Sequence, residues 1–558
     1  MTLGAVRVAL LGSGLVGATR LSELAGRVRS VSDVDAVARS LPGSAHLVVS
    51  VGGDVRVQGS VTGLRRVFHA DVNGVPVAGD RADLLASLSG AGVDEQMLAV
   101  RVACGMLPSP LSEQSVWSGV RAVPPDCYLH LGSGPARAVR WWSPPEPELR
   151  LADGAVAVRE ALGAAVDRRH PRSGRLAADL SGGMDSTSLC FLADRDGPGL
   201  LTFRWSEAEA VNDDALFADE SARSLPEAEH LVVPQERLPS IFADPAGVSV
   251  DGEYPYLFAR TTARARHSAG VLAEHGACSH LAGHGGDELF HALPGYLPGL
   301  LRRRPLTALR HLRGYRALHR WPLAPTLAGA TRPGPVGSWW QAQADQLTTP
   351  VPRRAPALGW GLTPLRAADW VTSQARDATR ELLRDTAEHV EPMAPDPGQH
   401  QILLALRSSA SGYRQLARLY AESGVRLEMP FYDDRVAEAA LAVRLHERAT
   451  PWRYKPLLAE AMRGTVPGGV LGRSTKGEFG EDLRVGLRRN LPAILEVFAD
   501  SVLAARGLID TDVLRTRLLS PQADFTTAIA LEYLLGCETW LRSVTDSAGS
   551  IDAATAAP

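Results

Sequence analysis

Residues 180–188 combine glycines, hydroxyls and a carboxylate in the pattern of a loop that grips a pyrophosphate group. Gly182 and Gly183 let backbone N–H groups approach an anion closely, and a following helix N-terminus adds favourable partial charge. Ser181 and Ser186 can donate hydroxyl hydrogens to phosphate oxygens, and Asp185 can hold Mg²⁺. No Gly-Lys-Ser/Thr follows the glycines, so the loop is not a Walker A motif. We predict a phosphate-binding loop that starts at Leu180.

Two later segments carry further candidate residues. Residues 281–290 place Gly283, His284 and Asp287 after an apolar stretch, as in the strand-end loops where open α/β sheets bind ligands. Asp287 would complete a metal pair with Asp185. Residues 473–479 form a loop whose Lys476 can neutralise charge on a transferring group.

The elements around these loops predict a parallel sheet. Residues 175–180 form a short apolar strand before the glycine loop, and residues 188–193 have helical character. Residues 199–205 and 230–233 are further buried strands between helical segments. Strands that alternate with helices indicate a doubly wound α/β domain.

The chain before this domain has a different pattern of secondary structure. Residues 1–142 alternate short strands with turns, as at 46–51 and 65–70, and end at a Pro-rich stretch. We expect an N-terminal domain at 1–142, a linker at 143–154, a second domain at 155–545 and a disordered tail at 546–558.

Composition restricts the class of protein. The 558 residues are 45% hydrophobic and 22% charged with a net charge of −3, which suits a globular protein with no bulk attraction for nucleic acid. We find no apolar run long enough to span a membrane, no secretory signal and no paired cysteine framework, and we expect a cytoplasmic location. Residues 301–344 contain no Asp or Glu, and seven arginines lie between positions 302 and 320. This pattern predicts a solvated helical face or a binding surface for an acidic peptide or partner.

One motif matches a dinucleotide-binding fingerprint but lacks the expected context. Residues 12–17 match the glycine fingerprint of dinucleotide-binding folds, and Asp33 and Asp35 follow at a suitable distance. That reading needs a second strand ending in the acid, whereas residues 31–38 have the pattern of an N-capped helix start. We do not expect a dinucleotide site.

In this order the three loops resemble the asparagine synthetase superfamily, whose members show S-G-G-x-D-S, then G-x-G-x-D-E-L-F, then Pro-Phe-x-Asp and a lysine loop. The third element is present at Pro430, Phe431 and Asp433, and residues 454–458 resemble the helix that follows. The N-terminal segment resembles the family's glutaminase-like domain, with 118–125 and 140–142 matching its closing strands.

The resemblance implies an N-terminal Ntn/glutaminase-like antiparallel αββα domain and a C-terminal adenine-nucleotide α-hydrolase-like (PP-loop) parallel-sheet synthetase domain. It implies that ATP adenylates a carboxyl group, that pyrophosphate leaves, and that an amine attacks the acyl-adenylate. ATP would lie on the 180–186 loop and Gly283, Mg²⁺ on Asp185 and Asp287, and Lys476 would stabilise the developing charge.

Departures from the family pattern select among its members. Glutamine-hydrolysing relatives carry a cysteine directly after the initiator Met, and this chain has Thr2, so we expect the amine to arrive with the substrate. β-Lactam synthetases place a tyrosine where this chain has His284 and a glutamate in the region of 408–411, where it has none. Asp433, Asp434 and the Thr-Lys-Gly of the lysine loop are most similar to lasso peptide cyclases, which join an Asp or Glu side chain of a ribosomal core peptide to the peptide's own α-amine. The alternatives are an asparagine synthetase-like amidotransferase using ammonia or a small amine, and ring closure of the β-lactam synthetase type.

That resemblance implies partners: a core peptide, a leader peptidase and a leader-recognition protein. His284 either takes the amine proton near neutral pH or shapes its loop. Tyr413, Arg414 and Arg418 either line the substrate cavity or serve packing and ion pairing.

Overall fold

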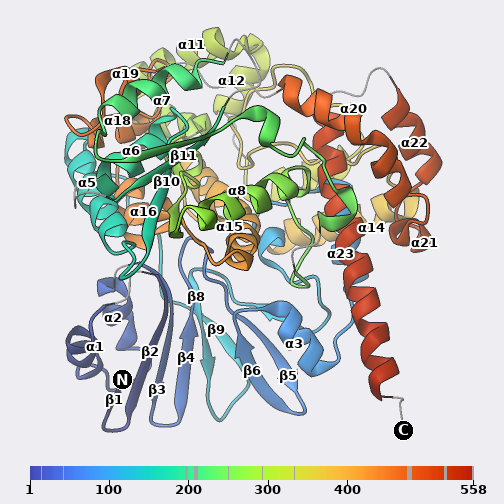
Figure 1. Ribbon diagram of the computed structural model, residues 1–558, viewed down its shortest axis with the longest axis horizontal. Coiled ribbons are helices and arrows are strands. Elements are labelled where there is room, and N and C mark those ends of the chain that lie inside the picture. The colour runs from blue at the N-terminus through green and yellow to red at the C-terminus, as the bar shows by residue number, and fades with distance from the viewer. Residues whose placement is uncertain are drawn as a thin grey trace.

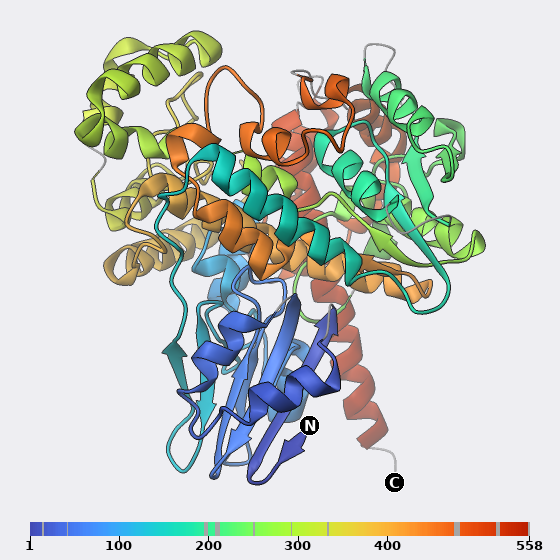
Figure 2. The same ribbon diagram turned by 90° about the vertical axis from the view of Figure 1, so that its left-hand side faces the viewer.

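A computed structural model describes residues 1–13, 16–41, 43–194, 199–206, 212–248, 251–291, 293–331, 334–473, 480–520 and 525–555, with the side chains of 547–555 excepted. Figures 1 and 2 show two layered parts, with the N-terminal sheets below the larger helical part. No described helix is both long and apolar enough to cross a bilayer.

The N-terminal part contains two antiparallel sheets. The first has the order β1-β2-β3-β4-β8-β9 and the second the order β6-β5-β7. Their strands are β1 (Thr2–Leu3), β2 (Val6–Ser13), β3 (Ser44–Val51), β4 (Asp54–Gln58), β5 (Phe68–Val72), β6 (Val75–Gly79), β7 (Arg121–Ala122), β8 (Cys127–Leu131) and β9 (Arg137–Arg140).

Helices α1 (Ala18–Ala25), α2 (Val34–Ser40) and α3 (Ala82–Ser89) cover the outer faces of these sheets. Helix α4 (Glu95–Cys104) packs instead against helices of the larger part. Leu24 and Val37 bury their side chains with the alternate residues Leu47 and Val49 of β3, whereas Leu85 of α3 packs against the second sheet. The layers run helices, sheet, sheet, helix, as Figure 1 shows from α1 and α2 across to α3. The predicted αββα class is confirmed.

The larger part is built on a five-stranded parallel sheet in the order β12-β11-β10-β13-β14. The strands are β10 (Arg175–Asp179), β11 (Leu201–Trp205), β12 (Glu229–Val233), β13 (Ala277–Leu281) and β14 (Arg426–Glu428). β10 lies in the middle and is buried on both faces, so its carboxyl end opens at the centre of the sheet edge. The predicted parallel sheet is therefore confirmed.

Helices surround this sheet and extend the domain. Those that contribute to or adjoin the site are α6 (Met184–Ala193), α7 (Asp214–Arg223), α8 (Thr262–Glu274), α9 (Gly286–Phe290), α15 (Pro397–Glu422), α18 (Pro456–Ala461) and α20 (Gly480–Val497). The others are α5 (Leu151–Asp167), α10 (Leu297–Arg303), α11 (Pro305–His319), α12 (Leu323–Thr331), α13 (Val336–Asp345), α14 (Ser373–His389), α16 (Asp434–Leu441), α17 (Leu445–Arg448), α19 (Gly468–Leu471), α21 (Val502–Ala505), α22 (Thr511–Leu519) and α23 (Phe525–Thr555).

The two parts share a continuous hydrophobic core. Trp141 and Trp142 lie at the expected end of the N-terminal domain. They are buried in one cluster with residues of the six-stranded antiparallel sheet and of the parallel sheet. The Trp142 indole donates to Glu438 of α16 at 2.8 Å, and the Val61 backbone N–H donates to Asp434 at 3.1 Å. The N-terminal part is thus fixed against the synthetase part by buried contacts.

The dinucleotide-like motif lies in an antiparallel setting. β2 pairs antiparallel with both β1 and β3, and Asp33 precedes helix α2 instead of ending a second parallel strand. The structure therefore agrees that residues 12–17 are not a dinucleotide-binding turn.

Candidate functional site

The predicted phosphate loop follows β10 directly and leads into α6. Gly182 has φ of +79°, and a Cβ there would overlap the carbonyl oxygen of Asp214, so only glycine fits this turn. The hydroxyls of Ser181 and Ser186 lie 2.8 Å apart across the loop. Helix α6 begins at Met184, four residues before the predicted start, because Gly183 already has the extended backbone of an N-cap. The loop therefore presents hydroxyls and free N–H groups at a helix N-terminus, which suits a phosphate chain.

The carboxylates of Asp185 and Asp287 both contact the ammonium group of Lys455. The Lys455 ammonium forms an ion pair with Asp185 and lies 2.8 Å from Asp287 Oδ1, which also accepts a hydrogen bond from the Tyr454 hydroxyl at 2.8 Å. The Lys455 side chain is 1% exposed and that of Asp185 19%, whereas Asp287 is 47% exposed toward solvent. The structure thus brings the two predicted carboxylates together around one positive charge.

Electrostatics at this cluster favour bound cations. Burial raises the pKa of Asp185, Lys455 opposes that shift, and Asp287 adds to it. Burial acts against the charge of Lys455, but the two carboxylates outweigh it and hold its pKa above the ordinary value. The ammonium therefore stays protonated at neutral pH.

The residues fit the Mg²⁺ that the family uses. Asp185 Oδ1 is buried and has no hydrogen-bond partner, and Asp287 lies within reach of the same cation. Among the described residues no group of three or more His, Cys, Asp or Glu side chains forms a metal cage. Mg²⁺ on a nucleotide needs only one or two carboxylates together with phosphate oxygens and water. Asp185 and Asp287 are therefore sufficient to hold it.

The loop that follows β13, at residues 282–286, packs tightly against the phosphate loop that follows β10. A Cβ on Gly283 would lie 3.1 Å from the Ser186 backbone nitrogen, and one on Gly286 would overlap the Asp185 carboxyl group. Gly285 has φ of +95°, and its N–H donates to Glu288 at 3.1 Å. The glycines thus permit the close approach that places both loops at one end of the sheet.

His284 stacks on an aromatic side chain of α15. Its ring centroid lies 4.5 Å from that of Tyr413 at an interplanar angle of 21°, and the Tyr413 hydroxyl donates to Glu288 at 2.7 Å. Burial lowers the pKa of His284 below its ordinary value. The imidazole is therefore neutral at physiological pH and can accept a proton.

A cavity of about 400 Å³ opens beside these residues. It extends from Ser181 and Asp179 at the end of β10, past the end of β11, to the face of α15. Its wall is largely aromatic and apolar, from Phe203, Trp205, Phe258, Ala265, Tyr413, Leu416 and Tyr420. The cavity lies at the carboxyl ends of parallel strands, where open α/β sheets bind their ligands.

Several predicted residues lie elsewhere. Lys476 falls outside the described residues. Tyr413 lines the cavity, but Arg414 and Arg418 point away from it and pair with Glu253 and Asp251. Thr2 is exposed in β1, at the end of the N-terminal sheet farthest from the synthetase part (Figure 1).

The paired aspartates after Pro-Phe are structural. Asp433 is fully buried beside Arg169 at 3.2 Å, and Asp434 accepts from the N-terminal part. Asp434 therefore joins the two parts, and Asp433 forms an ion pair within the larger part. Neither lines the cavity of about 400 Å³, which we call the nucleotide cavity.

Sequence reasoning missed Lys455 as a site residue and the pair Asp179–His280. The Nε2 of the buried His280 lies 2.9 Å from Asp179 Oδ1, and Asp179 lines the cavity. A signal for Lys455 was available, because the chain contains only two lysines among its 59 Lys and Arg residues, at 455 and 476.

The comparisons with known proteins identify the family. The model of the asparagine synthase family matches residues 157–542, more than half of the chain, and the chain belongs to this family. It therefore contains an asparagine synthase-type, ATP-dependent carbon–nitrogen ligase domain. No curated protein matches the chain.

Two solved structures are similar over part of the chain. One is glutamine phosphoribosylpyrophosphate (PRPP) amidotransferase from B. subtilis complexed with ADP and GMP, at 11% identity over 43% of this chain and 47% of that chain, with a TM-score of 0.18. The other is described as the allosteric regulatory enzyme of purine biosynthesis, at 12% identity over 50% of this chain and 59% of that chain, with a TM-score of 0.17. This chain thus matches only about half of each, and we draw no conclusion from scores of this size.

Proposed function

We propose that the protein is an ATP-dependent lasso peptide cyclase. The Asp or Glu side-chain carboxylate of a core peptide attacks the α-phosphorus of ATP, and the α,β-phosphoanhydride bond breaks to release pyrophosphate. The peptide's N-terminal amine then attacks the acyl-adenylate carbonyl, loses a proton and expels AMP. The products are a macrolactam, AMP and pyrophosphate.

The observation that carries this proposal is the nature of the cavity wall. A free amino acid substrate brings an α-carboxylate and an α-ammonium, which need charged partners when they are buried. The two arginines of the described wall are already engaged, since Arg204 pairs with Asp219 and Arg264 with Asp482. The wall also contains the carboxylates of Asp179, Asp214 and Asp482, and Asp482 is the partner of Arg264. No arginine of the described wall is therefore left for a free α-carboxylate, and the aromatic side chains favour contact with a polypeptide.

The chain's own residues have distinct tasks in this scheme. Ser181, Ser186 and the loop N–H groups would bind the departing pyrophosphate. Asp185 and Asp287 would hold Mg²⁺, which supplies charge neutralisation on the phosphates when it is bound. Lys455, and Lys476 as predicted from the sequence, would add positive charge where negative charge develops.

His284 suits the role of general base. Its neutral imidazole lies beside the cavity, and the stacked Tyr413 ring, itself held by Glu288, limits the orientations of the imidazole. An amine that attacks the acyl-adenylate must lose a proton, and a group with a pKa at or below neutrality is free to take it.

The amine is expected to come from the peptide and not from glutamine. Burial raises the pKa of the Cys104 thiol to about 12 and that of Cys127 to about 11, and the thiols of Cys190 and Cys537 are likewise raised by burial. These thiols are protonated at neutral pH and are poor nucleophiles. A leader peptidase and a leader-recognition protein would deliver the core peptide.

The test is to offer the purified protein ATP and Mg²⁺ with two kinds of acceptor. One reaction contains a core peptide with a free N-terminal amine and an internal Asp or Glu, and the other contains aspartate and ammonia. We expect a product lighter than the peptide by one water, resistant to carboxypeptidase because its tail is threaded. Asparagine formed with no effect of the peptide would instead establish the amidotransferase alternative.

A further inference from the structure

A second cavity, of about 220 Å³, lies between the N-terminal part and the synthetase part. Its walls come from the start of β3, the β4–β5 connection, the end of β6, the end of α5, one face of α15 and β14. Five arginines line it, against two carboxylates: Arg65, Arg66, Arg169, Arg414 and Arg418, against Asp80 and Glu428. We call it the interface cavity. It is separate from the nucleotide cavity, which faces the other side of α15.

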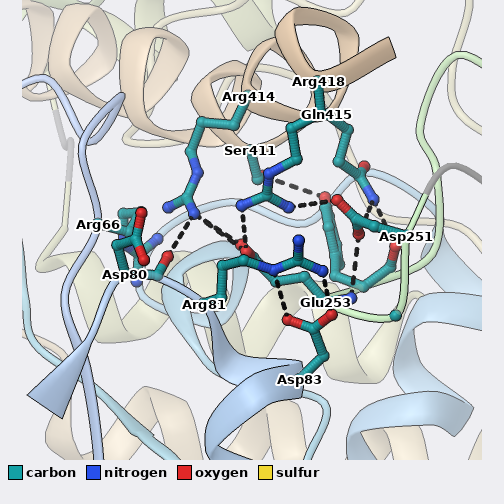
Figure 3. Close-up of polar contacts among 12 residues, drawn as sticks. Arg66, Asp80, Arg81, Asp83, Asp251, Glu253, Ser411, Arg414, Gln415 and Arg418 are labelled. Atoms are coloured by element: carbon teal, nitrogen blue, oxygen red, sulfur yellow. Dashed lines mark hydrogen bonds and ion pairs between the residues drawn. The ribbon is translucent and has the colours of Figure 1, made fainter. Parts of the chain in front are cut away.

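Three of these arginines have carboxylate partners. Arg169 lies 3.2 Å from Glu428, and Arg414 lies 3.0 Å from Glu253. Arg418 pairs with Asp251 and Glu253. Figure 3 shows Arg414 and Arg418 extending from α15 toward these acids, with Arg66 and Asp80 beside the Arg414 guanidinium.

The other two arginines have only neutral acceptors among the described residues. Arg65 donates to the Ser44 carbonyl at 3.3 Å and to the Ser13 hydroxyl at 3.2 Å. Arg66 donates to the Glu113 carbonyl and is only 5% exposed. Carboxylates act on both charges without a direct hydrogen bond: Glu428 and Asp80 on Arg65, and Glu113 and Glu253 on Arg66. Burial outweighs them and lowers the pKa of both guanidinium groups, so a directly hydrogen-bonded anion would be favourable here.

Polar atoms without partners are concentrated around this cavity. The Nε of Arg66, the Nη1 of Arg414 and the Oγ of Ser44 are all buried and make no hydrogen bond. Their residues line the cavity and are at most 9% exposed. Buried donors in native proteins normally have partners, so three unpaired donors around one void indicate a missing acceptor. The imidazole of His46, also in the wall, has its pKa lowered by burial to about 4 and adds no charge.

We propose that the interface cavity binds a small oxyanion of the phosphate or carboxylate class, held between Arg65, Arg66 and Ser44 of the N-terminal part and Arg414 of α15. The volume of the cavity accommodates inorganic phosphate or a small carboxylate-bearing group. Bound there, the anion joins the two parts of the molecule through charge-assisted hydrogen bonds.

The interface cavity and the nucleotide cavity lie against different faces of the same helix, α15. Arg414, Ala417 and Arg418 face the interface cavity, whereas Tyr413, Leu416 and Tyr420 of the same helix face the nucleotide cavity. An occupied interface cavity fixes the position of α15, and with it the aromatic wall against which the peptide would lie.

The test measures the thermal midpoint Tm in 10 mM inorganic phosphate against chloride of equal ionic strength. We expect the wild-type Tm to rise by about 2 °C through preferential binding to the folded state, and calorimetry to give a submillimolar Kd. A parallel titration with succinate distinguishes a carboxylate ligand from a phosphate ligand. If neither anion raises the wild-type Tm more than chloride does, the proposal is overturned.

Variants locate the bound anion. Arg66→Met should lose the response to the anion, whereas Arg313→Met, which changes an exposed arginine on α11, should keep it. Ser181→Ala alters the phosphate loop and should also keep it. A response that disappears in Ser181→Ala and persists in Arg66→Met would place the anion at the nucleotide site and refute the proposal.

Ala417→Glu offers a test that does not remove an arginine. Its carboxylate would enter the interface cavity as a built-in anion, so this variant should have a raised Tm in chloride and no response to phosphate. A wild-type response to phosphate in Ala417→Glu would contradict the assignment.

Discussion

Replacing Lys455 by methionine removes the one ammonium that joins Asp185 and Asp287. Methionine keeps the length and the apolar stem of the side chain, so the loss is chiefly of charge and hydrogen bonds. Removal of one partner from a buried ion pair typically costs about 3–5 kcal/mol, because a charge is left without compensation. Asp287 is half exposed and its share is screened by water, so we expect the lower end, about 3 kcal/mol.

Equilibrium unfolding in urea at pH 7 measures this cost. The matched control is Arg484→Met, which breaks an exposed ion pair with Glu481 on α20 and should change the free energy of unfolding by about 0.5 kcal/mol or less. Mg²⁺ should stabilise Lys455→Met more than the wild type, since the two carboxylates then lack their resident cation.

Catalytic activity gives an independent readout. Lys455→Met should lose nearly all ATP-dependent activity, because Asp185 and Asp287 lose the ammonium that holds them together beside the nucleotide phosphates. A loss of stability below about 1 kcal/mol would show that Lys455 is not held between the carboxylates, and full activity would refute its place in the site.

Three further predictions, two of them with a matched control substitution, test helix α15 and the loops of the site. Burial lowers the pKa of His400 from 6.5 to about 4, so the folded state binds a proton less readily than the unfolded chain, and stability is lost as the pH falls below about 6.5. In urea titrations, His400→Asn should reduce the stability lost between pH 7 and pH 5 by about 2 kcal/mol. An unchanged loss would show that this histidine is not buried in its neutral form. Tyr413→Phe removes a hydrogen bond to a carboxylate and should cost about 1.5–3 kcal/mol, whereas Tyr432→Phe removes one to a backbone carbonyl and should cost about 1 kcal/mol; equal losses would contradict the contacts described. Gly286→Ala should sharply reduce activity, because its Cβ would overlap the aspartate of the phosphate loop, and Gly270→Ala, where the space is open, should not; equal activity would refute the tight packing of the two loops.

Much of the fold was predictable because local pattern and tertiary structure agree. The apolar segment before Gly182 is β10, and the segment before Gly283 is β13, so each glycine loop follows a strand of one parallel sheet. Parallel neighbours end at the same edge, which is why Asp185 and Asp287 are close in space although distant in sequence. Their catalytic roles, and the domain boundaries, stay predictions.

The remaining features of the site depend on long-range contacts that no local pattern contains. Lys455 has the left-handed φ of +42° immediately before the proline that starts α18, and only the folded chain shows that its side chain lies between the loop carboxylates. Arg414 and Tyr413 are adjacent on α15, yet they face different cavities. Helical position alone could not assign them, because both faces of α15 are buried.

The position at which ATP is cleaved tests the central claim most directly. The purified protein, the core peptide and ATP labelled at the α-phosphate are incubated with Mg²⁺, and the nucleotide product is identified by chromatography, with Asp185→Asn as the inactive control. We predict AMP and pyrophosphate in equal amounts with the closed ring. The formation of ADP and orthophosphate, with no AMP, would contradict acyl-adenylate chemistry at this site.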